Sequence, residues 1–172
     1  MNEHDRSVIF GSKKMDWRTP PHVFEYIQRL TRNPFDLDAA ANESNHLCPR
    51  WIGPGGEWED ALSERPWNGQ KIWLNPPYGR NVGKWMKKAY KESLRPNRPC
   101  ISCLIFARTD TRWWHDFAMR AQFIFFIRGR ISFHSDHGPL SAAPAPSCIV
   151  RFSNRNGSRI APSIGSIVIP KP

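Results

Sequence analysis

The stretch KIWLNPPYGR, residues 71–80, holds the side chains best suited to chemistry in this chain. An apolar run with strand character ends there in Asn75-Pro76-Pro77-Tyr78, and Gly79 then allows the backbone to turn. Because neither proline has an N–H to donate, the strand cannot continue its pairing. The four residues are therefore predicted to form a stiff loop at a strand end, which is where open α/β sheets bind ligands.

Two hydrogen-bond acceptors in this loop suit a reaction at an exocyclic amine. Such an amine is a poor nucleophile, because its lone pair is delocalised into the ring or carbonyl. The side-chain oxygen of Asn75 and the main-chain carbonyl of Pro76 can bind both amino hydrogens, while Tyr78 can stack on the planar group. The tetrad resembles the catalytic motif of amino-methyltransferases, which transfer the methyl group of S-adenosylmethionine to adenine, cytosine or glutamine nitrogen. A purely structural turn is the alternative.

Length and composition indicate one soluble domain. The chain has 172 residues, enough for one domain with a real core and too few for two large ones. No apolar run approaches the ~20 residues of a membrane span, and the opening MNEHDRSV does not resemble a signal peptide. Four scattered cysteines do not form the pattern of a secreted disulfide scaffold. We therefore expect a cytoplasmic protein that does not contact membranes.

The formal net charge of +10 is distributed unevenly. Residues 1–75 contain 9 Lys and Arg against 11 Asp and Glu, whereas residues 76–172 contain 16 against 4. The basic charge therefore follows the predicted loop. This asymmetry suits a first half that holds a small cofactor and a second half that faces a polyanion, and it favours nucleic acid over a protein substrate. A merely basic, solvated surface is the alternative.

The elements before the loop are predicted from punctuation and spacing. Thr19-Pro20-Pro21 is typical of a helix start, with Thr19 as the cap and Pro20 at the first helical position. Apolar residues then recur at helical spacing and should face the core: Val23, Phe24, Ile27 and Leu30.

A short strand over residues 34–38, PFDLD, is predicted next and ends in Asp38, before Ala39-Ala40-Ala41. A carboxylate at this strand end can accept from ribose hydroxyls or lie near a sulfonium cofactor, although strand-end Asp is also a common helix cap. Residues 42–67 are irregular because they are rich in glycine and proline. Within them Asp60 could bind the adenine amino group of a cofactor, or lie in an ordinary surface turn.

After the loop, a helix is predicted from Asn81 to Leu94, with its lysines mostly off the apolar face, where they could touch phosphates or water. Strands are predicted at 101–106, 123–127, 131–133 and 147–152. No element could be placed firmly after residue 153. The predicted organisation is thus a loose arm at 1–16, one domain at 17–153 and a tail at 154–172.

Two possible metal sites are disfavoured. Cys100 and Cys103 lie in a buried strand, where an offset of three sends their side chains to opposite faces, so we interpret them as core residues. His134 and His137 flank a turn beside Gly138 and are interpreted as loop residues. No metal is expected.

Eight blocks resemble, in sequence order, the phage-type DNA N6-adenine methyltransferases. They extend from Trp17 to about Phe152: TPPHVF, FDLDAAANESN, EDAL, WNGQKIWLNPPYGR, VGKWMKKAYKES, ARTDTRWWHDF, FIRGRISF and APAPSCIVRF. The resemblance implies an α/β fold of the Rossmann-like, S-adenosylmethionine-dependent methyltransferase type, with a mostly parallel sheet and helices on both faces. It also implies methyl transfer to the 6-amino group of adenine in double-stranded DNA, in a bacterial host cell.

The resemblance also implies residue roles. Asn75, Pro76, Pro77 and Tyr78 occupy the catalytic motif. The cofactor contacts it implies are Thr19, Pro20, Asp38, Ala39, Asp60 and Asn75. Ala39-Ala40 stand where many methyltransferases have a glycine-rich turn. A second acidic residue that could bind the ribose hydroxyls is not obvious, and Glu43 is the candidate.

Target recognition is predicted to lie in the basic half. Only 36 residues separate Asp38 from Asn75, too few for an inserted recognition domain. Loops at 108–114 and 128–137 can read a short or relaxed target after the adenine flips out. The predicted DNA contacts are Arg80, Lys84, Arg108, Thr109, Arg112, Trp113, Arg128 and Arg130. Action on RNA or on cytosine N4, and a non-catalytic DNA-binding role, stay open, as does the oligomeric state, with a monomer slightly favoured.

Overall fold

The computed structural model describes residues 17–32, 34–135, 138–153 and 162–170. The helices are α2 (Pro21–Thr31), α3 (Val82–Ser93), α4 (Arg112–Asp116) and the 3-10 turn η1 (Ala118–Arg120). The strands are β1 (Leu37–Asp38), β2 (Lys71–Leu74), β3 (Cys100–Phe106), β4 (Phe123–Ile127), β5 (Ser132–Ser135), β6 (Gly138–Ala142), β7 (Ser147–Phe152) and β8 (Ser163–Ile167).

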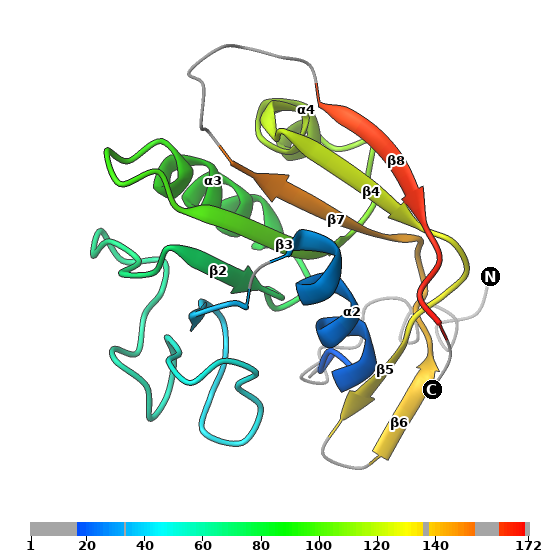
Figure 1. Cartoon of the computed structure of the whole chain (residues 1–172), viewed down its shortest axis with the longest axis horizontal. Coiled ribbons are helices and arrows are strands. Elements are labelled where there is room, and N and C mark those ends of the chain that lie inside the picture. The colour runs from blue at the N-terminus through cyan, green and yellow to red at the C-terminus, as the bar shows by residue number, and fades with distance from the viewer. Residues whose placement is uncertain (1–16, 33, 136–137, 154–161, 171–172) are drawn as a thin grey trace, which may run out of the picture.

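A six-stranded sheet in the order β1-β2-β3-β7-β4-β8 forms the centre of the molecule (Figure 1). β1, β2 and β3 are mutually parallel, and β7 pairs antiparallel with both β3 and β4. β8 is parallel to β4. Every strand except β7 therefore points the same way, so the carboxyl ends of β1, β2, β3 and β4 meet at one edge. The predicted mostly parallel α/β sheet is confirmed.

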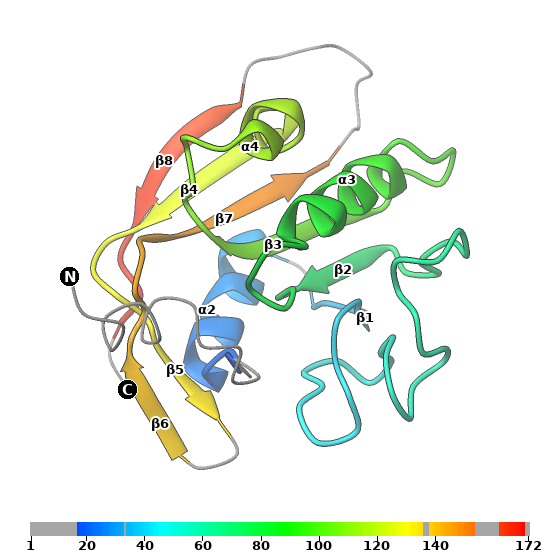
Figure 2. The ribbon, with the colours of Figure 1, turned by 180° about the vertical axis from the view of Figure 1, so that it is seen from behind.

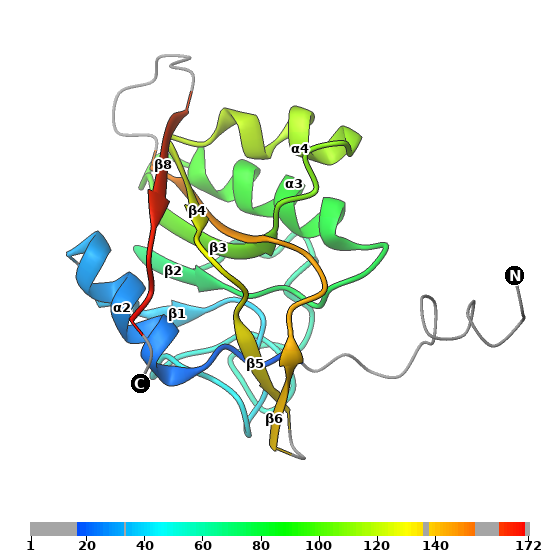
Figure 3. The same ribbon diagram turned by 90° about the vertical axis from the view of Figure 1, so that its right-hand side faces the viewer.

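Helices cover both faces of this sheet, as predicted (Figures 1, 2 and 3). On one face, α3 and α4 pack over the inner strands through buried residues such as Met86 and Trp114. On the other face, α2 and the two-stranded β5–β6 sheet pack over Leu104 and Ile149. β3 is buried along almost its whole length because both of its faces are covered, which explains a sequence that is apolar except at Ser102.

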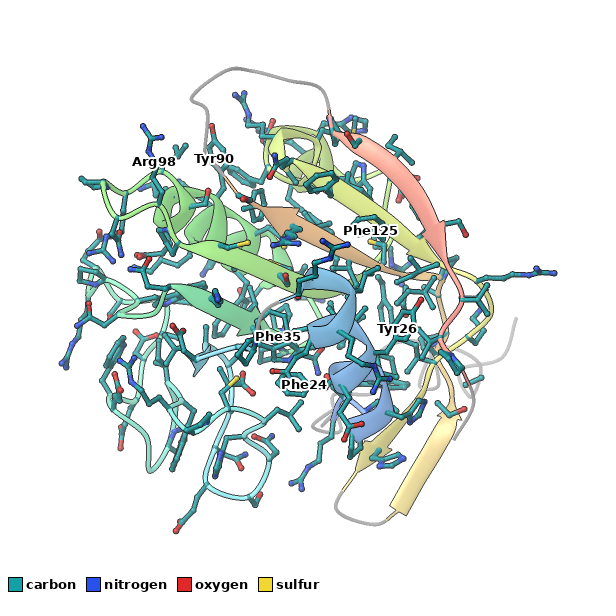
Figure 4. The ribbon with its side chains drawn as sticks, viewed as in Figure 1. Phe24, Tyr26, Phe35, Tyr90, Arg98 and Phe125 are labelled. Carbon is teal, nitrogen blue, oxygen red and sulfur yellow. The ribbon has the colours of Figure 1, made fainter. Side chains whose placement is uncertain are left out.

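The start of α2 differs from the prediction. Pro20 is the N-cap and Pro21 the first helical residue, and Thr19 makes no capping hydrogen bond. Phe24 packs against Phe35 and Trp73, with ring centroids 5.5 and 5.3 Å away, and Figure 4 labels the two phenylalanines between α2 and the sheet. Leu30 is 39% exposed, whereas Thr31 is buried, so the buried face of α2 ends on Thr31 and leaves out Leu30.

The lysines of α3 do not form one uniform solvated face. Lys88 is only 12% exposed and lies 2.9 Å from the buried carboxylate of Glu92. Its Nζ also donates to the carbonyls of Ser63 and Arg65, at 2.8 and 3.0 Å. Lys88 thus ties α3 to the irregular segment before β2 and is not free for phosphate, contrary to its grouping with the exposed lysines. Leu94 is 49% exposed and does not join the core face.

The segment predicted as a tail contributes β8 to the central sheet, where it forms the edge beside β4. The sheet therefore extends beyond residue 153. At the other end of the described chain, Arg18 pairs antiparallel with His134, which adds the segment before α2 to the side of β5. His137 lies outside the described residues.

Candidate functional site

Asn75 follows the last residue of β2 directly and so lies toward the shared carboxyl edge, between the end of β1 and the middle of β3, where Leu74 pairs with Cys103. Pro76 is buried and Pro77 is exposed. Gly79 has φ +145°, a conformation that favours glycine, and this allows the chain to turn into α3. The predicted stiff loop at a strand end is confirmed.

The Asn75 amide is held by one hydrogen bond. Its Nδ2 donates to the main-chain carbonyl of Trp17 at 2.6 Å, across 58 positions in sequence. Its Oδ1 is buried and has no hydrogen-bond partner among the described residues. Buried polar oxygens are nearly always paired, so an unpaired one in a strand-end loop is what a missing ligand with an N–H donor would leave. The arrangement leaves the acceptor free and commits the donor.

Tyr78 belongs to an aromatic cluster next to Asn75. Its ring stacks on Phe106, with centroids 4.1 Å apart, and meets the rings of Trp17 and Phe133 edge-on at 6.4 and 5.9 Å. Its hydroxyl donates to the Leu104 carbonyl at 3.2 Å. Burial raises the pKa of the Tyr78 hydroxyl well above its usual 10.0, so Tyr78 is neutral over the working range of pH. The contacts thus fix the orientation of the ring, and burial keeps its hydroxyl neutral.

Sequence reasoning missed Trp17 as a site residue, because its contribution is a main-chain carbonyl. The Arg18 N–H donates to the His134 carbonyl at 2.9 Å, and the His134 N–H donates back at 3.0 Å. The Trp17 ring packs edge-on against the fully buried Phe133, with centroids 5.3 Å apart. The available sequence signal was its place two residues before the TPPHVF block.

Asp38 lies at the end of β1, as predicted, but its carboxylate binds main chain. It accepts from the N–H groups of Ala40 and Leu47, at 3.3 and 3.2 Å, and its exposed fraction is 3%. Burial raises the pKa of Asp38 from 3.8 to about 6, against the opposing effect of the two N–H donors and of His46. Asp38 therefore shapes the segment after β1. Ala39 is fully buried, and its N–H donates to the Trp73 carbonyl.

An open cavity of about 430 Å³ lies beside this segment. Its lining residues are Arg18, Asn42, Glu43, Ser44, Pro54 and Gly55. The Arg18 guanidinium donates to Ser44 Oγ at 3.1 Å and to the Ser44 carbonyl at 3.3 Å, which fixes one wall. Next to the lining residues Pro54 and Gly55, position 53 needs glycine, because a Cβ on Gly53 would lie 1.9 Å from the Ala41 carbonyl oxygen. Close backbone approach thus occurs here and not at Ala39-Ala40.

The other predicted cofactor residues occupy different settings. Thr19 is buried, and its Oγ1 has no hydrogen-bond partner among the described residues. Pro20 is buried at the start of α2. Asp60 is exposed, and its Oδ1 accepts from the Leu62 N–H at 2.9 Å, a local turn contact.

The predicted DNA contacts lie around the same edge of the sheet. Arg108 and Thr109 follow β3, and Arg128 and Arg130 follow β4; all four are exposed. Arg80 and Lys84 are exposed at the start of α3. Arg112 is 94% exposed and lies 3.3 Å from Asp116, whereas Trp113 is half-buried against Gly83. Apart from Trp113, these are solvent-facing polar or cationic groups.

The described residues also bear on metal binding and on membrane contact. Within the described ranges, no group of three or more His, Cys, Asp or Glu side chains is placed to hold a metal ion. Cys103 is buried in the core, whereas Cys100 accepts a hydrogen bond from Arg151 Nε at 3.1 Å. Among the described helices, none is long and apolar enough to cross a membrane.

Comparison with known proteins gives a consistent family. The profile of the family described as DNA N-6-adenine-methyltransferase (Dam) matches residues 6–165. The chain is 32% identical over 117 residues to a DNA N-6-adenine-methyltransferase of Escherichia phage T1; this alignment covers 67% of this chain and 46% of that protein, less than half its length. It is 31% identical over 127 residues to a DNA N-6-adenine-methyltransferase of Haemophilus phage HP1 (strain HP1c1), covering 72% and 70%. The chain belongs to the phage-type DNA N-6-adenine-methyltransferase family.

Proposed function

We propose that this protein transfers the methyl group of S-adenosylmethionine to the 6-amino group of adenine in double-stranded DNA, with the target base flipped out of the helix. The observation that carries the proposal is Asn75: its Oδ1 is buried, unpaired among the described residues and oriented by the bond from Nδ2 to Trp17. Family membership supplies the substrate class.

The chemistry follows from two acceptors. Asn75 Oδ1 and the Pro76 carbonyl accept the two hydrogens of the target amine, which withdraws its lone pair from conjugation with the ring. As the N–C bond formed, the C–S bond of the methyl donor would break and leave a thioether; the amine proton, acidic only once the new bond forms, would pass to water. A strong general base is therefore unnecessary, which explains a loop built from amide and carbonyl oxygens.

Tyr78 is proposed to stack on the extruded adenine. Extrusion costs a few kcal/mol, and stacking on an aromatic ring returns roughly 1–3 kcal/mol. Because Phe106 and the Leu104 carbonyl hold the ring, little ordering is needed when the base arrives.

The cofactor is proposed to bind in the cavity beside Arg18. Arg18 offers a cation for the amino-acid carboxylate, and Glu43 a carboxylate for the ribose hydroxyls. The buried, unpaired Thr19 Oγ1 is a further group that a ligand could satisfy. When bound, the cofactor supplies an electrophilic methyl group on sulfur. Pro20, Asp38 and Ala39 are proposed to shape this site, and Asp60 to contact the adenine of the cofactor.

DNA is proposed to lie across the carboxyl edge. Exposed Arg and Lys side chains there suit the phosphate backbone, and arginines can also read guanine. The residues proposed are Arg80, Lys84, Arg108, Thr109, Arg112, Trp113, Arg128 and Arg130. We expect the protein to act in the cytoplasm of a bacterial host and to methylate a short or relaxed target sequence. Mapping N6-methyladenine along a methylated genome tests this, and methylation confined to one long site would contradict it.

The proposed reaction is tested by incubating the purified protein with unmethylated DNA and methyl-labelled S-adenosylmethionine, followed by nucleoside digestion and mass analysis. Labelled N6-methyladenine is expected, and Asn75→Ala should bind cofactor but lose methylation by orders of magnitude. Labelled N4-methylcytosine, or label entering only RNA, would overturn the substrate assignment. If the protein binds the cofactor but methylates neither DNA nor RNA, the proposed methyl transfer is wrong. If it does not bind the cofactor, the alternative of a non-catalytic DNA-binding protein is favoured.

A further inference from the structure

The side-chain amide of Asn75 could lie in two orientations, and only one is productive. In one orientation, Oδ1 accepts from the target amine of the proposed reaction; in the other, Nδ2 takes its place and two donors would face each other. Leaving a buried donor or acceptor unpaired is unfavourable, so a partner outside the side chain decides its orientation. That partner is the Trp17 carbonyl, 2.6 Å from Nδ2.

We propose that Trp17 is a positioning residue: its main-chain carbonyl fixes the acceptor orientation of Asn75, and pairing with β5 holds that carbonyl in place. The proposal rests on the proposed function, since it explains how the acceptor of that reaction is presented. It assigns a task to the segment before α2 and to β5, neither of which belongs to the catalytic motif.

Two independent restraints hold Trp17. On its carboxyl side, Arg18 and His134 exchange two main-chain hydrogen bonds, at 2.9 and 3.0 Å. The Trp17 ring lies edge-on to Phe133, Phe106 and Tyr78, with centroids 5.3, 6.1 and 6.4 Å away. Since Tyr78 stacks on Phe106, one residue connects the acceptor and the stacking ring of the site. Displacing Trp17 should therefore disturb both.

The direct test is the Asn75→Asp variant. It places a second carboxylate oxygen where Nδ2 now meets the Trp17 carbonyl, so the ionised form repels that carbonyl, whereas the protonated form can donate to it. We expect methylation about 30-fold or more below wild type at neutral to alkaline pH, with the ratio to wild type rising as the pH falls. The neighbouring charged and titratable residues Asp38, Tyr78, Arg18 and His134 are the same in both proteins, so the ratio to wild type isolates the effect of the substituted residue. A variant as active as wild type at alkaline pH would overturn the proposal.

Trp17 itself is tested with two substitutions. Trp17→Ala should lower kcat by about 10-fold or more, leave the Kd for S-adenosylmethionine within ~3-fold, and be largely rescued by Trp17→Phe, which keeps an aromatic ring. Tyr90→Ala is a matched control, because Tyr90 is a half-buried aromatic on α3, outside the site (Figure 4), and contacts Phe117 and Phe152. It should lower stability without a selective loss of kcat. Equal losses of kcat in both alanine variants would overturn the role.

A readout without turnover separates this proposal from the proposed function. The Asn75 side-chain NH2 should show one hydrogen protected from solvent exchange in nuclear magnetic resonance spectra, and Trp17→Ala, which keeps the carbonyl but removes the ring contacts that hold it, should weaken the protection. If the protein methylates nothing yet the protection is present, only the proposed function fails. If it methylates DNA and both Asn75 hydrogens exchange freely, only the positioning role fails.

Discussion

Tyr78 lies face to face with Phe106, with ring centroids 4.1 Å apart and ring planes inclined by 23°. One face of Tyr78 is therefore occupied, and its hydroxyl is fixed on the Leu104 carbonyl at 3.2 Å. A flipped base can use only the opposite face. The geometry presents a rigid platform of one orientation, which limits the conformational entropy lost on binding.

Replacing Tyr78 separates its ring from its hydroxyl. Tyr78→Phe loses one hydrogen bond, worth about 0.5–1.5 kcal/mol, and should reduce kcat/KM by no more than about 10-fold. Tyr78→Ala loses base stacking, roughly 1–3 kcal/mol, and should reduce kcat/KM about 5- to 150-fold. Steady-state methylation of a short duplex measures both. Equal kcat/KM for the alanine variant and wild type would remove Tyr78 from the mechanism.

Lys84 and Lys88 lie one turn apart on α3, and alanine substitution should affect DNA binding at Lys84 and stability at Lys88. Lys84→Ala should lower the slope of log K against log salt for DNA binding by about 0.9, because one phosphate contact is lost. Lys88→Ala leaves the buried Glu92 short of a partner and should cost about 1–3 kcal/mol of unfolding free energy, about 2–4 °C in Tm per kcal/mol. Salt titrations and thermal melts distinguish them, and a changed salt slope for Lys88→Ala would contradict the assignment.

Asp38 should make stability depend on pH. Its pKa is about 6 in the folded protein against 3.8 when exposed, so the folded state binds the proton more tightly. Its contribution to stability is therefore complete below pH ~4 and is lost as the pH rises through ~6, about 3 kcal/mol in total. Asp38→Asn should lack this component. Urea unfolding across this range, wild type against variant, measures it, and parallel curves would refute the raised pKa.

Gly53 and Gly79 give a matched pair for backbone strain. Both have positive φ, +135° and +145°, but only at Gly53 would a Cβ meet another atom, the Ala41 carbonyl oxygen at 1.9 Å. Each alanine variant should lose about 1–3 kcal/mol from strain, and Gly53→Ala should lose more because the cavity wall must move. Denaturant midpoints compare them. If Gly79→Ala is the less stable variant, the close contact at Gly53 does not determine which substitution costs more stability.

The fold and the catalytic loop were predictable because local chemistry determines them. Two prolines end β2 wherever it lies, and the mostly apolar run of β3 is typical of a strand covered on both faces. The family was identified correctly because each of its sequence blocks is a continuous segment of the chain and can be recognised without knowledge of the fold. β8 was missed because glycine and serine give SIGSI little strand propensity, and its pairing with β4 supplies what propensity lacks.

Contacts between distant segments were not predictable. Lys84 and Lys88 look alike in sequence, and only the approach of the Ser63 and Arg65 carbonyls separates them. Asp38 was correctly placed at a strand end, but its two N–H partners depend on how residues 40–47 fold back. Thr19 was predicted as a helix cap, whereas its hydroxyl makes no such bond. Main-chain partners such as the Trp17 carbonyl leave no residue signature.

The pairing of Arg18 with His134 also sets the order in which the protein becomes competent during translation. A nascent chain that has just completed its catalytic loop still lacks β5, because 59 positions separate Asn75 from His134. At ~5–20 residues per second, the ribosome needs about 3–12 s to add them. Until then the Trp17 carbonyl lacks its pairing with β5, so on the role proposed for Trp17 an incomplete chain released early would carry the whole Asn75–Tyr78 motif without an oriented acceptor.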